Sequence, residues 1–260
     1  MNRPRSPGTC ICVAGSDLPD IDYLRPVCPG SADLLALTGS DGKKKELRIA
    51  IDVINWPVGP LQANCYFIFD SESGAGIVVD PGGDSDFLVK AIAETGGRCE
   101  AIFVTHGHSD HLGGVAGLAE ATGAPVYASA GAELALTEPA KFMLFPGMPP
   151  VEAHAVDHLL QGGETIAIGG IEVQVIATPG HSPGSLTFFI DDSLFTGDLL
   201  FHGSIGRTDL PGGSFEMLAA SVKNLILRYP PDTKVYPGHG NTTTLAAERE
   251  DNPFITDLGW

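Results

Sequence analysis

Three histidines and an aspartate are concentrated in the six residues from His106 to His111, in a chain that contains only eight histidines. Neutral imidazole and carboxylate groups are the ligands that zinc, iron and manganese accept in proteins. Gly107 gives the backbone freedom to turn, so that His106 and His108 can reach the same point in space. The pattern therefore indicates a metal site rather than a polar loop with solvated histidines.

Further candidate ligands occur where predicted strands end, at His181, Asp198 and His239. Side chains at the ends of neighbouring strands gather at one edge of a sheet, where open α/β sheets bind their ligands. Seven ligands are too many for one tetrahedral zinc ion, but they suit two ions about 3.5–4 Å apart that share a carboxylate and a water. Such ions lower the pKa of that water from about 15.7 towards about 7 and polarise a carbonyl. The spacing therefore predicts hydrolysis by a metal hydroxide, without a serine or cysteine nucleophile.

The elements that must position these groups alternate between strands and helices. Apolar and alternating runs predict strands at residues 47–53, 64–69, 75–80, 101–104, 124–128, 164–168, 171–177, 186–190, 193–198 and 234–237. Helical spacing predicts helices at residues 87–95, 112–122, 214–229 and 243–252. This alternation favours a layered α/β architecture.

The segment from residue 133 to residue 158 is rich in proline and is expected to be an irregular excursion rather than one helix. His154 and His158 stand four residues apart, as two ligands of one metal would on a helix face. Because no third ligand is nearby and Pro149-Pro150 disfavours a helix, we expect solvated or capping histidines there.

The composition narrows the range of partners. The formal net charge of -17 repels phosphate backbones and anionic lipid surfaces, so neither nucleic acid nor membrane is an expected partner. No apolar run reaches the roughly 18 residues of a membrane span. The five irregularly spaced cysteines are expected to be reduced thiols: Cys10, Cys12, Cys28, Cys65 and Cys99. Together these features predict a cytoplasmic protein that acts on a small molecule.

The run from Thr105 to His111, taken with His181, Asp198 and His239, resembles the five motifs of the metallo-β-lactamase superfamily. The resemblance covers about residues 53–260. It implies a four-layer αββα sandwich built from two similar halves, with the metal ions at one edge.

The resemblance also implies a role for each candidate ligand. The implied ligands of the first metal ion are His106, His108 and His181. Those of the second are Asp110, His111 and His239. Asp198 would bridge two divalent ions, zinc or alternatively iron or manganese, and Asp110 would also orient the hydroxide, which makes these two carboxylates the expected catalytic residues. Asp80 would support the metal ligands from behind, with a simple strand-to-turn cap as the alternative.

Within the superfamily, Asn64-Cys65-Tyr66, residues 201–209 and residues 237–240 resemble the glyoxalase II-like hydrolases, which cleave S-(2-hydroxyacyl)glutathione. The resemblance implies that Arg207 and His202 contact the substrate, while a surface ion pair is the alternative for Arg207. Two differences from these hydrolases indicate a short form of the family. A C-terminal helical domain is expected to be missing, and Asp209 stands where an aromatic glutathione contact is usual. The expected substrate is therefore this thioester or a related one.

Two other activities fit the same fold. A persulfide dioxygenase would use one iron held by two histidines and an aspartate, and it shares the run Gly206-Arg207-Thr208-Asp209. The complete second set of ligands and the glycine after His239 favour hydrolysis instead. A lactonase or β-lactamase would differ only in its substrate pocket, and a non-enzymatic metal-binding module is a further alternative.

Residues 1–46 differ in composition from the rest and are expected to form a loosely ordered extension to a hydrolase domain at residues 47–260. A transit peptide is disfavoured because such leaders are poor in acidic residues, whereas this one carries Asp17, Asp20, Asp22 and Asp33.

Overall fold

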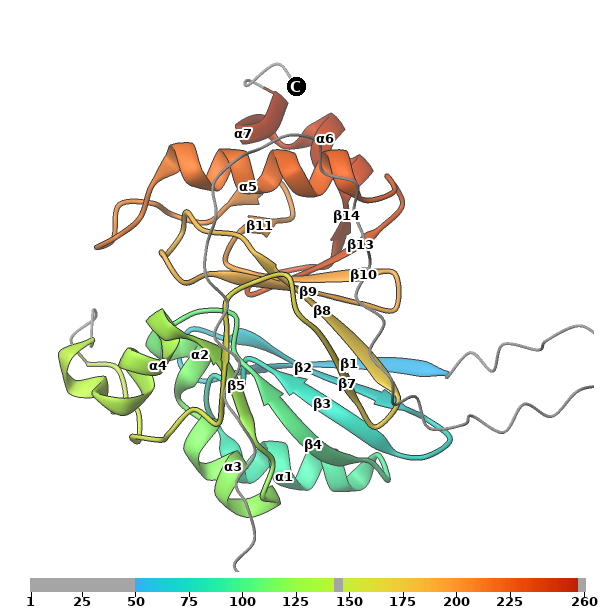
Figure 1. The fold of residues 1–260 in the computed structure, drawn as a ribbon, viewed down its shortest axis with the longest axis vertical. Helices are drawn as coiled ribbons and strands as arrows, with labels where there is room; N and C mark the ends of the chain where they lie inside the picture. Colours follow the sequence, from blue (N-terminus) through green and yellow to red (C-terminus); the bar gives the residue numbers. More distant parts are fainter. Residues whose placement is uncertain (1–49, 143–146, 257–260) are drawn as a thin grey trace, which may run out of the picture. The chain divides into compact units, whose positions relative to one another are not determined.

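The structure is a computed structural model that describes residues 50–142 and 147–256. The predicted extension at residues 1–46 and the predicted start of the first strand at residue 47 lie outside these ranges. Two six-stranded sheets face each other, and helices cover the outer face of each (Figure 1). The predicted four-layer αββα sandwich of mixed α/β class is therefore confirmed.

The first sheet contains six strands in sequence order: β1 (Ile51–Val58), β2 (Ala63–Asp70), β3 (Ala75–Val79), β4 (Arg98–Phe103), β5 (Val126–Ser129) and β6 (His158–Leu160). The first three pair antiparallel, and the rest of the sheet is parallel. Helices α1 (Ser85–Glu94) and α3 (Val115–Thr122) pack on its outer face. The parallel strands direct their carboxyl ends to one edge of the sheet.

The second sheet has the order β14-β13-β10-β9-β8-β7. Its strands are β7 (Thr165–Ile168), β8 (Ile171–Ala177), β9 (Leu186–Ile190), β10 (Ser193–Gly197), β13 (Lys234–Pro237) and β14 (Thr243–Thr244). Helices α5 (Phe215–Arg228), α6 (Leu245–Asp251) and α7 (Pro253–Thr256) lie outside it. A separate hairpin consists of β11 (Leu200–Phe201) and β12 (Ser204–Ile205).

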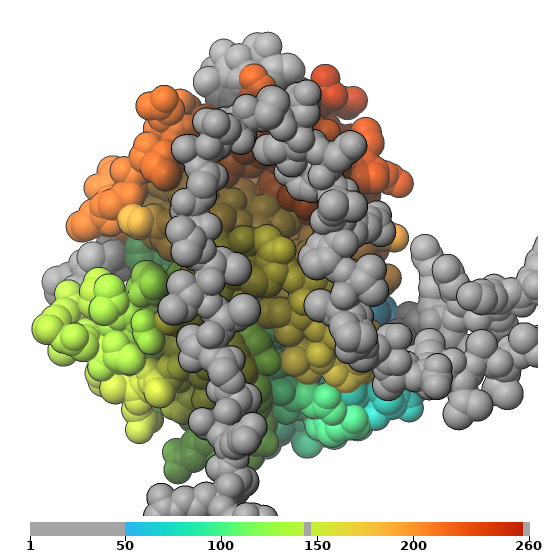
Figure 2. Space-filling view, in the orientation of Figure 1, coloured from blue at the N-terminus to red at the C-terminus, as the bar shows by residue number. Residues whose placement is uncertain are grey.

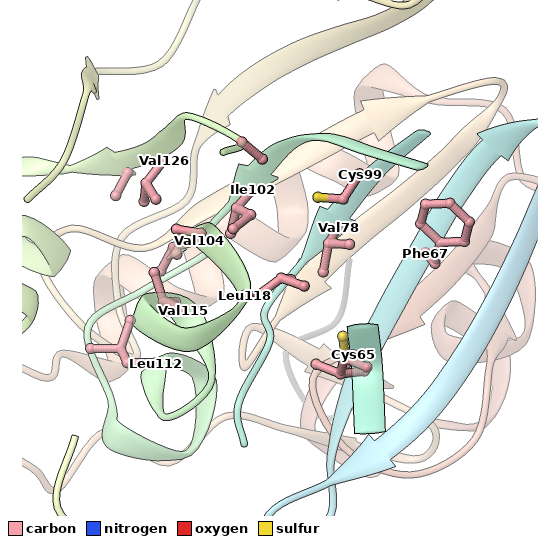
Figure 3. Packing of buried hydrophobic residues seen from close by; sticks show 14 of the residues in the cluster. Cys65, Phe67, Val78, Cys99, Ile102, Val104, Leu112, Val115, Leu118 and Val126 are labelled. Atoms are coloured by element: carbon pink, nitrogen blue, oxygen red, sulfur yellow. The ribbon is translucent and has the colours of Figure 1, made fainter. Parts of the chain in front are cut away.

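Strand β2 shows how the sequence produces the layers. Successive side chains of a strand point to opposite faces, and all eight residues of β2 are buried. Cys65 and Phe67 pack beneath the helices of the first half (Figure 3). Tyr66 and Ile68 point the other way, into a second core between the two sheets. A strand covered on both faces reads as a continuous apolar run, which is what residues 65–69 contain.

Two predicted helices need correction. The single helix predicted at residues 112–122 is two helices, α2 (Ser109–Leu112) and α3. The break comes at Gly113-Gly114, where a Cβ on Gly114 would lie only 2.7 Å from the Gly83 carbonyl oxygen. The tail predicted as helix from residue 243 begins instead with β14, which pairs with β13 before α6 starts.

The segment at residues 133–158 is irregular in its second part, as predicted, but its start belongs to α4 (Ala130–Thr137), followed by the short 3-10 helix η1 (Pro139–Lys141). His158 begins β6, and its ring stacks on Tyr127 with 4.4 Å between centroids. The backbone N–H of His154 donates to the Leu136 carbonyl at 3.0 Å. Neither histidine belongs to a metal-ligand cluster in the described ranges.

Within residues 50–142 and 147–256, no helix combines the length and hydropathy that a bilayer crossing requires. Cys65 and Cys99, the two cysteines in these ranges, are free and buried. Burial raises the pKa of both thiols, to about 12 for Cys99. They are unreactive core residues.

Candidate metal centre

The predicted ligand run leaves the carboxyl end of β4 and continues into α2. His106, Asp110 and His111 are all buried, and His111 is 0% exposed. The predicted reason for Gly107 was only partly right. Its backbone does not adopt the left-handed conformation, and glycine is favoured instead by crowding, because a Cβ would lie 3.2 Å from the Ala132 Cα in α4.

The other three predicted ligands also follow strands of the second sheet. His181 lies in the loop after β8, Asp198 directly follows β10, and His239 follows β13. The structure brings all seven predicted groups to one edge of the sandwich. The nearest pairs include Nδ1 of His108 with Nε2 of His181 at 2.7 Å, and Oδ2 of Asp110 with Nε2 of His239 at 3.1 Å.

The first cluster consists of His106, His108 and His181, whose ligand atoms all lie within 4.8 Å of one another. Nδ1 of His181 donates to the Arg207 carbonyl oxygen at 2.8 Å. A carbonyl can only accept, so Nε2 of His181 presents a lone pair. The Thr105 hydroxyl donates to Asp80 at 2.6 Å and therefore accepts from Nδ1 of His106 at 3.0 Å.

Nε2 of His106 therefore presents a lone pair as well. Both lone pairs point at Nδ1 of His108, at 3.0 Å from His106 and 2.7 Å from His181. That nitrogen carries at most one hydrogen, so the three atoms cannot satisfy one another. A cation at their centre would satisfy all three, and the cluster passes this test of fit for a metal ion.

The second cluster consists of Asp110, His111 and His239, again with ligand atoms within 4.8 Å. Nδ1 of His111 donates to Asp80 at 2.8 Å, which leaves a lone pair on Nε2. This Nε2 and Oδ1 of Asp198 are buried, lack a hydrogen-bond partner, and lie 3.3 Å apart. When His111 is neutral, these are two buried acceptors facing each other, which is costly unless a proton or a metal ion lies between them.

Asp198 lies between the two clusters. Its Oδ1 faces His111, while its Oδ2 lies 3.6 Å from Nε2 of His181 and 3.8 Å from Nε2 of His239. One carboxylate thus borders the ligand atoms of both clusters, which is the placement that a bridging ligand requires.

Asp80 is close to the same ligands but plays a different part. Its Oδ1 accepts the Thr105 N–H at 2.7 Å, and its Oδ2 accepts both the Thr105 hydroxyl and Nδ1 of His111. Because both oxygens are already hydrogen-bonded, Asp80 orients one imidazole in each cluster: His111 directly and His106 through Thr105. The simple strand-to-turn cap considered for Asp80 does not describe these contacts.

The local electrostatics favour the ligand forms of His106, His108 and the two carboxylates, but not those of the histidines in the second cluster. Burial lowers the pKa of His106 well below its ordinary value and that of His108 to about 4, so both are neutral imidazoles. Burial disfavours the charge on His111 too, but the nearby carboxylates outweigh it and raise its pKa. Burial opposes ionisation of Asp110 and Asp198, yet the surrounding histidines hold the pKa of each below its usual range. Despite burial, neighbouring carboxylates also raise the pKa of His239, so a divalent ion at the second cluster would have to displace protons from His111 and His239, because metal ligands must be deprotonated.

Two polar residues of β2 hold the loop that carries His239, a role that the sequence analysis missed. The Asn64 side-chain amide donates to the carbonyls of Pro237 and Gly240, both at 2.9 Å. The Tyr66 hydroxyl donates to the Pro237 carbonyl at 2.7 Å. The sequence does carry a signal for this role, because Asn64 and Tyr66 are hydrogen-bonding residues in a strand that is otherwise mostly apolar.

The two predicted substrate contacts lie at the surface beside the cluster. His202 is an exposed residue in the turn between β11 and β12. The exposed Arg207 side chain forms two 2.7 Å hydrogen bonds with Asp209, which is the ion pair considered as its alternative role. That pairing lowers the pKa of Asp209 to about 2.

A family model described as the metallo-beta-lactamase superfamily matches residues 58–239. The chain therefore belongs to the metallo-β-lactamase superfamily, a superfamily of metallohydrolases. The match begins in β1 and ends on His239, so it spans both sheets and every residue of the two clusters.

Two curated relatives match at similar levels. A probable metallo-hydrolase, YqgX of Bacillus subtilis, is 37% identical over 204 residues, which are 76% of this chain and 95% of the relative. The hydroxyacylglutathione hydrolase GloC of Haemophilus influenzae is 36% identical over 204 residues, with the same coverage of 76% and 95%.

Two solved structures are similar over their full length. The BLEG-1 B3 metallo-beta-lactamase has a TM-score of 0.75 and 38% identity, over 79% of this chain and 100% of its own. TTHA1623 in a di-iron-bound form has a TM-score of 0.66 and 39% identity, over 78% of this chain and 100% of its own.

Asp80→Asn should weaken metal binding in both clusters, because the amide offers one acceptor oxygen where the carboxylate offers two. We expect a loss of metal affinity of about 10–100-fold, the usual effect of removing a partner that orients metal ligands. Titration of metal-free protein with zinc measures it. Asp157→Asn is the matched control, since Asp157 accepts a backbone N–H from Val126 away from the clusters. Equal affinities in the two variants would contradict the orienting role.

Asn64→Ala should release the Pro237–Gly240 loop and affect His239 selectively. At limiting zinc we expect the ratio of bound metal to protein to fall from two towards one, as measured by elemental analysis. Cys65→Ala is the control, because it removes a buried side chain from the opposite face of the same strand. Loss of both ions together in Asn64→Ala would count against a role confined to His239.

Proposed function

We propose that this protein is a binuclear metallohydrolase, and that it cleaves S-(2-hydroxyacyl)glutathione or a related thioester. The observation that carries the proposal is the presence of two complete clusters with opposed, unpaired lone pairs, joined by Asp198. The similarity to the hydroxyacylglutathione hydrolase GloC over nearly its whole length supports the choice of a thioester.

We assign the ligands by cluster. His106, His108 and His181 would hold the first ion, and Asp110, His111 and His239 the second. Asp198 would contact both. Nitrogen and oxygen donors suit Zn²⁺ best, although the same donor types accept iron or manganese. The di-iron form of TTHA1623 supports iron as the alternative.

Bound divalent ions would lower the pKa of a water molecule and polarise the substrate carbonyl. The protein supplies orientation for this chemistry. Since neighbouring histidines keep Asp110 ionised, its carboxylate suits a hydrogen-bond acceptor that orients the attacking water rather than a base that stores its proton. A thiol has a pKa of about 8.5, so the thiolate leaves without a dedicated general acid.

The substrate would extend over the surface that carries Arg207 and His202. Arg207 is the stronger candidate for a carboxylate of the thiol carrier, because guanidinium groups pair with carboxylates in two parallel hydrogen bonds. Asp209 already occupies that geometry, so the substrate would have to displace it. Because Asp209 competes for Arg207, we expect a thiol carrier that makes few ionic contacts with the protein.

Specific observations bear on two other activities, those of a persulfide dioxygenase and of a β-lactamase. A persulfide dioxygenase with one iron would not need the second cluster, which is complete here. A β-lactamase is supported by the 38% identity to BLEG-1. Both are tested by measuring oxygen uptake with glutathione persulfide and hydrolysis of a β-lactam beside hydrolysis of lactoylglutathione.

We further propose that residues 47–260 form the hydrolase domain and that the protein is cytoplasmic, a location supported by the free thiols of Cys65 and Cys99.

Asp198→Ala should lower the bound metal from two ions to one or none and reduce kcat for lactoylglutathione by about 10³-fold or more, since Asp198 borders both clusters. Elemental analysis and thiol release are the measurements. Asp209→Ala, which removes an exposed carboxylate nearby, should keep both ions. Wild-type turnover with two ions in Asp198→Ala would refute the bridging assignment.

Deletion of residues 1–45 should leave thioester hydrolysis and the thermal midpoint unchanged, because the described residues from residue 50 onward already supply both metal-ligand clusters and three hydrophobic cores. Circular dichroism and the same assay test this. A truncated protein that fails to fold would show that the domain begins before residue 47.

A further inference from the structure

A cavity of about 220 Å³ opens beside the first cluster, and the sequence analysis did not anticipate it. His108 forms part of its lining, and its walls are mainly the apolar side chains of Leu134, Ala135, Phe142, Pro183 and Pro211. These come from α4 with the residue that follows η1, from the loop after His181, and from the loop after Arg207. Three segments far apart in the sequence thus enclose one apolar space next to a ligand imidazole.

The walls of the cavity are packed against one another. A Cβ built on Gly131 at the start of α4 would lie 3.4 Å from the Gly184 Cα, and one built on Gly212 would lie 2.7 Å from Pro183. The cavity is therefore already formed. Its volume is below the about 300–1,000 Å³ of pockets that enclose a whole drug-sized ligand, so it suits one part of a substrate.

The mouth of the cavity is unusually apolar for a surface. Leu134 is 51% exposed and Phe142 is 39% exposed. The yellow-green residues that include α4 stand at the molecular surface, at the left of the view in Figure 2. Exposed apolar side chains that line one concavity indicate a binding site rather than scattered surface residues.

The chemistry of the lining selects the part of the substrate that can enter. Among the described residues that line the cavity, none is a lysine, arginine, aspartate or glutamate. A charged thiol carrier such as glutathione would lose its hydration there without gaining an ionic partner. An apolar acyl group would instead exchange water for carbon contacts. Because His108 belongs to both the cavity and the cluster, a group in the cavity lies next to the reacting carbonyl.

We propose that this cavity is the acyl-binding subsite and that the protein prefers thioesters with an apolar acyl chain of several carbons. The inference rests on the proposed thioesterase activity and specifies its substrate class. Each methylene that enters the cavity adds about fourfold to kcat/KM. We expect no further gain in kcat/KM once the acyl chain is too long for the cavity.

The test compares S-acetyl-, S-butyryl- and S-hexanoylglutathione with the full-length, zinc-loaded protein. We expect kcat/KM to rise by about tenfold or more from acetyl to hexanoyl, less than full burial would give because the cavity is open on one side. Leu134→Ser should cut the hexanoyl-to-acetyl ratio of kcat/KM about fivefold. Leu159→Ser is the matched control, since Leu159 is 53% exposed and lies on β6, outside the cavity.

A binding measurement separates this inference from catalysis. S-hexylglutathione has no carbonyl and cannot be hydrolysed, and it should bind more tightly than S-methylglutathione in calorimetry, with a more negative heat-capacity change. Leu134→Ser should remove most of that difference, and Leu159→Ser should not.

Each outcome is decisive. Thioester hydrolysis without dependence on chain length, or the same effect of both leucine variants, overturns the acyl-binding subsite and leaves the proposed function standing. Failure to hydrolyse lactoylglutathione and all three of these thioesters with two zinc ions bound refutes the proposed function, and the acyl-binding subsite fails with it.

Discussion

The constraint on which the structure depends is the convergence of buried lone pairs at one edge of the sandwich. Nε2 of His111 and Oδ1 of Asp198 are buried without hydrogen-bond partners, and two imidazoles direct lone pairs at His108. Such an arrangement opposes folding unless protons or metal ions occupy it. Metal binding therefore contributes to the stability of this edge of the sandwich as well as to catalysis. The surrounding residues hold the ligand side chains in the orientation that the metal ions require.

Both halves of the fold hold an acidic metal ligand in place in the same way. A Cβ on Gly82 would lie 1.7 Å from the backbone oxygen of Asp110, and a Cβ on Gly206 would lie 1.8 Å from that of Asp198. The backbone of each aspartate thus lies against a loop that only glycine permits, one loop from each half. Asp80 then ties the clusters together through His111 and Thr105. The repeat of the fold is also a repeat in how its acidic groups are held.

Much of this was predictable, for identifiable reasons. The ligands could be found because histidine is rare in the chain and because each strand that carries one ends where its apolar run ends. The hairpin at β11 and β12, with two residues in each strand, was not found because such strands show no periodicity. The clamp formed by Asn64 and Tyr66 depends on contacts across more than 170 positions of sequence, which no local pattern encodes.

The metal ligands and the cavity lie on different parts of the fold. The ligands follow regular strands, whereas the cavity walls come largely from irregular segments. The clusters lie at strand ends fixed by packed cores, so the fold itself sets the positions of the donor groups. The cavity is walled by α4, by Phe142 beyond it and by loops at Pro183 and Pro211. Ala135 of α4 belongs to a core, but Leu134, Phe142 and the two prolines do not. A rigid metal edge combined with a variable apolar wall allows one hydrolytic centre to serve different acyl groups, because the wall alone decides which of them reach it.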